Sequence, residues 1–140
     1  MRQEIFDGLR DCLLDDGSVV KHVSLWNENV VFAEEDEPWD RPAVFVEFSP
    51  IAWESVKERS RYHTRSRIVL HVVTDWSSES ELPVFSVVDG IVDRVDGLCG
   101  EHFGPLRLVE SQTNHNHEDL VESIEVFEYR GWREELRVES

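Results

Sequence analysis

Lysine is almost absent from this chain of 140 residues, in which Lys21 and Lys57 are the only two. Arginine supplies the other fixed cations, and 14 basic residues stand against 30 acidic ones, so the formal net charge is −16. Such a charge opposes binding to nucleic acid or to an anionic membrane surface. Heavy acidity with so little lysine resembles proteins of high-salt cytoplasms, where the screening length is about 3 Å at 1 M salt. We therefore expect a halophilic source.

Cysteine and long apolar runs are also scarce. Cys12 and Cys99 are too few for a disulfide framework, and each lies in an apolar helical pattern, so we expect two buried free thiols. No apolar run approaches the roughly 20 residues that span a bilayer. The first residues lack the basic and apolar segments of a signal peptide. The sequence predicts a single domain over residues 1–140, folded in a cytoplasm and not associated with a membrane.

Motifs of catalysis and cofactor binding are missing as well. The chain has no G-x-S-x-G, P-loop or G-x-G-x-x-G sequence. With 30 carboxylates, chance proximity is expected, so no acidic pair indicates a general acid and base. His63 and His71 lie in a predicted strand, and the sequence leaves open whether a distant Ser and Asp join either of them. We therefore expect that the protein is not an enzyme and binds no cofactor.

One short string has the residue types of a metal site. His115, His117 and Asp119 form an H-x-H-x-D pattern that could in principle supply ligands. A metal site also needs a fixed backbone and supporting hydrogen bonds, which the polar and turn-rich segment 112–119 does not indicate. We expect a hydrated hairpin loop there and no metal.

Two segments have the spacing of amphipathic helices. Apolar residues recur every three or four positions over 2–15, and Gly17 is placed to end that helix. The same spacing returns over 84–98, with Gly97 or Gly100 as the closing residue. Each helix is expected to bury one face.

The best-defined strand lies in the stretch 41–53, RPAVFVEFSPIAW. Pro42 and Pro50 bracket a run whose alternate positions are nearly all apolar, so both faces of the strand are covered and we expect it in the interior of a sheet. Residues 51–60 fit a turn of helix and an extended excursion equally well. Further strands are expected in 19–32 (two, or one with a bend), 59–72, 106–111 and 120–132.

The alternation of the last strand slips once, which indicates a bulge or burial on both faces near its middle. The order of elements is a helix, several strands, a helix and two strands. This order predicts an α+β fold, with a largely antiparallel or mixed sheet of about five strands and the two amphipathic helices packed on one face.

The segment from Arg59 carries an unusual stripe. In an extended chain, alternate side chains project from one face, and here these are Arg59, Arg61, His63, Arg65 and Arg67. One row of arginines on so acidic a chain gives too little positive charge to indicate binding of nucleic acid. Two other interpretations carry equal weight. The arginines could pair with glutamates across the same sheet, at about 0.2–1 kcal/mol a pair, or they could meet an acidic surface of a neighbouring subunit.

The segment 33–40, AEEDEPWD, offers such an acidic surface. Glu34 and Glu35 supply the charge, and Trp39 is a large apolar residue in a loop, so it is either an exposed anchor or folded back over the core. Together with Arg59, Arg61, Arg65 and Arg67, these three residues are the predicted subunit interface. Trp26 and Trp53, which flank strands, are expected to complete the core.

The stretch 25–54, LWNENVVFAEEDEPWDRPAVFVEFSPIAWE, together with the later IVLHVVTDW, FGPLRL and NHNHEDLVESIEVFEYRG, resembles a family of short proteins encoded in structural modules of tailed phages and prophages of Bacteroidetes-like bacteria. By length and order of elements, that family is similar to tail terminator, or tail completion, proteins. The resemblance covers most of the chain as a pattern of hydrophobic and aromatic positions and turns. It includes no catalytic motif.

The resemblance implies a small α+β subunit that closes into a ring, usually of six copies, on the last ring of the tail tube. Such a ring ends tube polymerisation and joins the tail to the head connector. The implied partners are further copies of the chain, the tail tube protein and the connector or neck proteins, with genomic DNA passing through the lumen without specific binding. The implied location is the virion, assembled in the bacterial host cytoplasm. A head-to-tail adaptor or other neck component is the near alternative, and a small enzyme or ligand-binding domain is the alternative of another class.

Overall fold

Two helices and six strands are formed by the residues that the computed structural model describes, which are 1–26, 40–56, 61–75, 84–117 and 120–134. The helices are α1 (Arg2–Leu13) and α3 (Val84–Val95). The strands are β1 (His22–Leu25), β2 (Ala43–Phe48), β3 (Glu54–Val56), β4 (Arg61–Asp75), β5 (Arg107–His117) and β6 (Leu120–Glu134). The predicted α+β class is confirmed.

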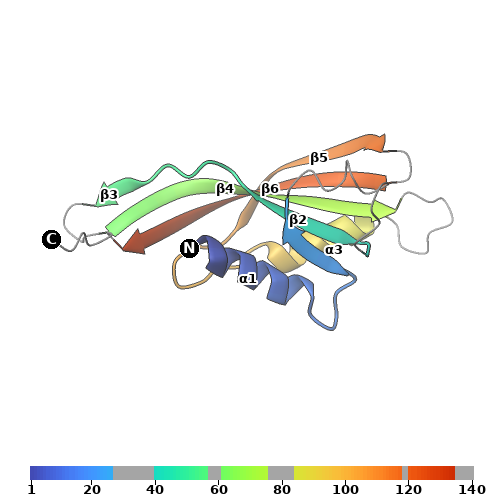
Figure 1. Cartoon of the computed structure of the whole chain (residues 1–140), viewed down its shortest axis with the longest axis horizontal. Helices are drawn as coiled ribbons and strands as arrows, with labels where there is room; N and C mark the ends of the chain where they lie inside the picture. Colours follow the sequence, from blue (N-terminus) through green and yellow to red (C-terminus); the bar gives the residue numbers. More distant parts are fainter. Residues whose placement is uncertain (27–39, 57–60, 76–83, 118–119, 135–140) are drawn as a thin grey trace.

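One mixed sheet joins all six strands in the order β1-β2-β4-β6-β5, with β3 pairing the start of β4. β1 is parallel to β2, and the other neighbours are antiparallel. β4 and β6 pair without interruption from Arg61 opposite Glu134 to Asp75 opposite Leu120. At about 3.4 Å per residue this ladder is about 50 Å long, and it runs the length of the molecule (Figure 1).

β2 is the interior strand that the sequence predicts. It lies between β1 and β4, and its first four residues, Ala43 to Val46, are fully buried although their side chains alternate between the two faces of the sheet. The stretch 51–60, which the sequence left ambiguous, is extended at β3. In the stretch 19–32, β1 is a single short strand, and residues 27–32 lie outside the described part of the chain.

The main core lies between the helices and one face of the sheet. The helices contribute Ile5, Leu9 and Leu13 from α1 and Val87, Val88, Ile91 and Val95 from α3. The sheet contributes Val44, Val46, Ile68, Leu70, Val72, Phe127 and Tyr129. Figure 1 shows both helices on the same side of the sheet, as predicted. The side chains of β4 in this core have even numbers, so its odd-numbered side chains point away from the helices.

The helix ends agree with the sequence only in part. α3 is followed by Gly97, whose φ of 86° is in the left-handed region that favours glycine at a helix end. Its N–H donates to Leu106 O at 2.8 Å, which turns the chain toward β5. α1 ends at Leu13, ahead of Gly17. No helix among the described residues has the length and apolarity needed to cross a membrane.

Two expectations about local structure are wrong. Residues 112–117, predicted as a hairpin loop, continue β5 as a polar edge strand paired with β6. Cys99 is exposed beyond the end of α3, and Cys12 is half-buried, although both are free thiols as expected. The predicted slip in β6 is explained by burial on both faces, because Val126 and Phe127 are buried on opposite sides of the sheet. The pairing of β5 with β6 also shifts register twice, between Leu108 and Glu110 and between Asn114 and His117.

Candidate functional site

Arginine side chains line the helix-free face of β4. Arg65 and Arg67 are exposed and Arg61 is half-buried, whereas the even-numbered Thr64 and Ser66 beside them are buried. The predicted alternation of this strand is therefore confirmed. The other predicted interface residues, Arg59, Glu34, Glu35 and Trp39, lie outside the described part of the chain.

The register of the sheet brings two further arginines to the same face. Arg130 of β6 lies directly opposite Arg65, and Arg107 of β5 lies opposite Glu128, which is itself opposite Arg67. We call Arg65, Arg67, Arg107 and Arg130 the arginine cluster. Like charges directly opposite each other destabilise a sheet. The one glutamate that the register places among these four arginines is Glu128.

Cross-strand pairing, one of the two interpretations of the stripe, is present but weak. Arg61 Nη2 lies 3.7 Å from Glu134 Oε1, His63 Nε2 lies 3.5 Å from Glu54 Oε2, and Arg65 Nε lies 3.9 Å from Glu128 Oε1. Exposed pairs of this kind contribute about 0–1 kcal/mol. Within the described residues, Arg67, Arg107 and Arg130 form no ion pair, so positive charge remains in excess inside the arginine cluster, where Glu128 is the one carboxylate.

The surface around the arginine cluster is hollowed on two sides. A cavity of about 350 Å³ is lined by Arg65, Arg107, Arg130 and Glu128, beside the Gly104-Pro105 turn. A larger one of about 660 Å³ shares Arg65 and Arg130 and adds Glu54, His63 and Trp132. Arg65 and Arg130 therefore stand between two hollows and can reach a partner that enters either one.

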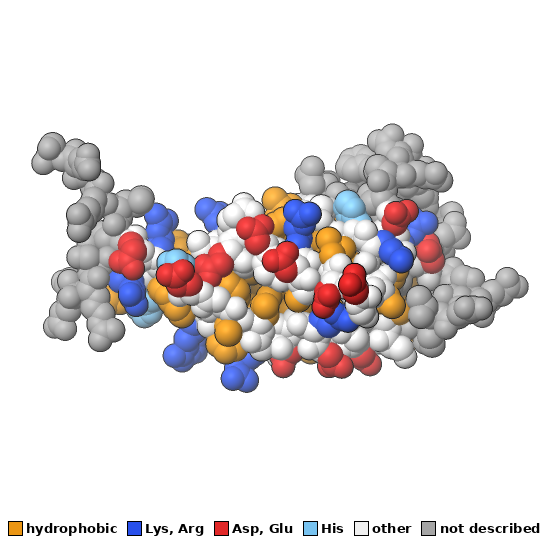
Figure 2. All heavy atoms as spheres, turned by 90° about the horizontal axis from the view of Figure 1, so that it is seen from below, with side chains coloured by type: hydrophobic (Ala, Val, Ile, Leu, Met, Phe, Trp, Pro, Cys, Tyr) orange, Lys and Arg blue, Asp and Glu red, His pale blue; other side chains and the backbone are white. Residues whose placement is uncertain are grey.

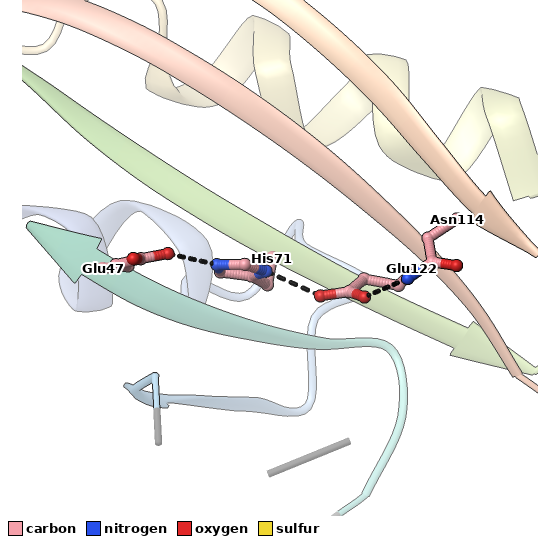
Figure 3. A network of polar contacts seen from close by, with 4 residues as sticks. All are labelled: Glu47, His71, Asn114 and Glu122. Carbon is pink, nitrogen blue, oxygen red and sulfur yellow. Dashed lines mark hydrogen bonds and ion pairs between the residues drawn. The ribbon is translucent and has the colours of Figure 1, made fainter. Parts of the chain in front are cut away.

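A buried polar network lies further along the same face of β4 (Figure 3). His71 Nδ1 lies 2.6 Å from Glu122 Oε2, and His71 Nε2 lies 2.7 Å from Glu47 Oε1. Asn114 Nδ2 donates to the other oxygen of Glu122 at 3.1 Å. Trp26 stacks flat on the imidazole, with ring centroids 3.7 Å apart. The network crosses four neighbouring strands, β2, β4, β6 and β5, and ties them together.

The charge state of this network follows from its geometry. Burial lowers the pKa of His71, but the hydrogen bonds and charges of Glu122 and Glu47 outweigh burial and raise the pKa overall. The imidazolium can donate to both carboxylates at once, which the neutral ring cannot. With both ring nitrogens occupied, His71 is not placed to act as a general base, and the arrangement is suited to holding strands.

Sequence reasoning missed this network, although one signal was available. Glu122 and Glu125 lie among mainly apolar residues in the first half of β6, and each is almost fully buried. A buried carboxylate requires a partner. Glu125 finds two hydroxyl donors, Ser111 Oγ and, at 2.9 Å, Ser123 Oγ. Ser123 is two residues from Glu125 in the same strand, whereas only the register of the sheet shows that His71 and Ser111 are the partners from other strands.

The structure describes only part of the H-x-H-x-D string. His115 and His117 lie in β5, and Asp119 is outside the described residues. Within the described part, no three His, Cys, Asp or Glu residues are grouped in a way that could hold a metal ion.

The arrangement of elements is shared with a solved structure. The chain is similar to a chain of the structure titled "Virion of native gene transfer agent (GTA) particle", with a TM-score of 0.55 and 13% sequence identity. The match covers 92% of each chain. What it shows is a common fold. No protein-family model matches the sequence, and no curated protein matches it.

Proposed function

We propose that the protein is a structural component of a tailed-phage-like virion, a tail terminator that closes as a ring on the end of the tail tube. The observation that carries the proposal is the shared fold with a virion chain, because the match extends over 92% of both chains. It agrees with the family resemblance of the sequence, which was identified from different features, namely the positions of apolar residues, aromatic residues and turns.

The charged surfaces fit a subunit of a ring. A ring needs a heterologous contact, in which one patch of a subunit meets a different patch of the next. The predicted interface joins Arg61, Arg65 and Arg67, with Arg59 ahead of them, to the acidic segment that holds Glu34, Glu35 and Trp39. Complementary charge of this kind contributes to register more than to affinity. The remaining carboxylates, in a chain of net charge −16, would repel DNA phosphates from a lumen.

The test is to co-express the chain with the tail tube protein of the same gene module and to image the products by electron microscopy. We expect a ring, of six copies by analogy with the family, on one end of each tube, and shorter tubes than without the chain. Mass measurement in molar salt gives the stoichiometry independently.

Two results would contradict the proposal. A strict monomer in molar salt, even with tube protein present, would overturn ring formation. A ring that binds the head connector and leaves tube length unchanged would instead assign the chain to the neck as a head-to-tail adaptor.

A further inference from the structure

We propose that neighbouring copies of this chain meet by placing the arginine cluster of one copy on the outer face of the α1–α3 layer of the next. This inference rests on the proposed function, because it names the two surfaces that would close the ring. In this arrangement the aspartates of the two helices take the place of the acidic segment 33–40 as the partner of the arginines.

The outer face of the helix layer is acidic because both helices carry aspartates at helical spacing. The series in and just after α1 is Asp7, Asp11 and Asp15, and the series in and just after α3 is Asp89, Asp93 and Asp96. All six are exposed. We call them the aspartate face. Figure 2 looks at the molecule from the helix side and shows acidic side chains over the middle of this surface.

Most of these carboxylates are not neutralised within the subunit. Arg94 Nη1 lies 3.9 Å from Asp15 Oδ2 and also donates to Cys12 O at 3.1 Å. Among the described residues, Asp11, Asp89 and Asp93 form no ion pair. The exposed Arg10 lies beside Asp7 and Asp11, so the aspartate face is not free of positive charge, but its carboxylates outnumber Arg10 and Arg94. Its net charge is therefore opposite to that of the arginine cluster, and both surfaces have charge left to satisfy.

The two surfaces lie on opposite sides of the sheet. The helices pack on the even-numbered side chains of β4, and the arginine cluster projects from the side of its odd-numbered residues. One copy can therefore contact two neighbours at once, one through each surface. Such a contact repeats from copy to copy, and it produces a ring if the rotation closes or a filament if it does not.

The docked state also removes an unfavourable feature of the free subunit. Arg65 and Arg130 face each other across the ladder, an arrangement of like charges that costs free energy in isolation. Aspartates entering the hollows on either side of this pair would bring opposite charge to both guanidinium groups, which can bind carboxylates in a bidentate manner. An acidic partner would therefore relieve the repulsion between Arg65 and Arg130.

Reversing the charges of each surface tests the inference. We expect Arg65→Glu with Arg130→Glu to raise the dissociation constant of self-association on the order of 100-fold, measured by sedimentation at 0.15 M salt. This double variant keeps a like-charged pair across the ladder, but it replaces the exposed Arg65–Glu128 pair, 3.9 Å apart, by a repulsion of about 0–1 kcal/mol, so its folding is compared with that of the neutral variant below. Asp89→Arg with Asp93→Arg should weaken association to a similar extent. A variant with all four substitutions should regain self-association, with a dissociation constant within about tenfold of that of the unmodified chain.

The matched control is Arg2→Glu with Lys21→Glu, which changes the net charge equally at exposed positions outside both surfaces. Its association should stay within about threefold of the unmodified chain. Circular dichroism of each variant checks folding, and Arg65→Gln with Arg130→Gln supplies a neutral variant whose loss should be intermediate.

Each other outcome overturns the inference. A ring that survives reversal of the cluster rejects this surface and leaves the proposed function standing, whereas an unmodified chain that never associates overturns both. Rescue of the reversed cluster by Glu34→Arg with Glu35→Arg, but not by the aspartate variants, would assign the partner surface to the acidic segment. Binding of a DNA duplex that is lost on cluster reversal would show that the cluster recognises phosphate.

Discussion

His71 shows how one side chain can couple the stability of this sheet to pH. The ring is 6% exposed and lies between Glu122, which is 3% exposed, and the more accessible Glu47. Its pKa is raised by these carboxylates in the folded state. A raised pKa means that folding favours the protonated ring. The stabilisation is therefore complete below the ordinary pKa of histidine, about 6.5, and is lost as the pH rises through the raised value.

We predict that His71→Gln destabilises the protein by about 3 kcal/mol at pH 6, because it leaves the buried Glu122 without its cation. The difference from the unmodified chain should shrink as the pH rises through the raised pKa of His71, because the imidazole then loses its proton. Urea unfolding at pH 6, 7.5 and 9 in constant molar salt measures it.

The control for this prediction is His63→Gln. His63 is exposed and lies 3.5 Å from Glu54, so its removal should change the free energy of unfolding by less than about 1 kcal/mol at any pH. A stability difference for His71→Gln that grows with pH would show that the ring is not an imidazolium in the folded state.

At the scale of elements, two glycines of α3 and its C-terminal turn should respond in opposite directions to the same substitution. Gly97→Ala places a side chain at a φ of 86° and should destabilise the protein by about 1 kcal/mol. Gly90→Ala lies inside the helix with open space around the new methyl group, so it should stabilise by about 0.5–1 kcal/mol. Thermal unfolding of the two variants under one condition gives both values, and equal effects would contradict this account.

The elements could be predicted from the sequence where burial leaves a regular pattern, with either one face or both faces apolar. β4 alternates between His63 and Ile68, where its even-numbered residues are buried and its odd-numbered ones are exposed, whereas Leu70 to Thr74 are buried on both faces. β2 was recognised as interior from its apolar residues on both faces. β5 was only half predicted, since residues 112–117 are polar and look like a turn. A strand at the edge of a sheet is hydrogen-bonded to a neighbouring strand on one side only. Its side chains are more exposed, so its sequence need not alternate between apolar and polar residues.

The candidate site could be predicted only in the part that lies on one strand. Arg61, Arg65 and Arg67 follow from alternation along β4. Arg107 and Arg130 reach the same face through the pairing of β6 with β4 and β5, and no local pattern encodes that register. The same holds for His71 and Glu122, which lie far apart in sequence.

For the whole molecule, the dominant electrostatic term is repulsion. The ion pairs of the arginine face are exposed and weak, whereas 30 acidic residues face 14 basic ones. Salt that screens charges should therefore stabilise more than it destabilises. A protein that is stabilised by salt in this way would suit a halophilic source.

We predict that the melting temperature rises by several degrees between 0.1 M and 2 M KCl. Differential scanning calorimetry measures the shift, and an uncharged osmolyte at equal water activity is the control that separates charge screening from exclusion of the solute from the surface. Equal melting temperatures in low and high salt would rule out net repulsion as the limiting factor and with it the halophilic interpretation.

The long ladder between β4 and β6 also has a consequence for the order in which the chain folds. Its residue pairs are not equally distant along the chain: Asp75 and Leu120 are the closest, and Arg61 and Glu134 are the farthest apart. Closing a shorter loop costs less entropy, so pairing should start at the Asp75 end and proceed toward Arg61. The end of the ladder that presents Arg65 and Arg130 would then form late, so the surface that we propose as a subunit contact would be completed only after the subunit has its core.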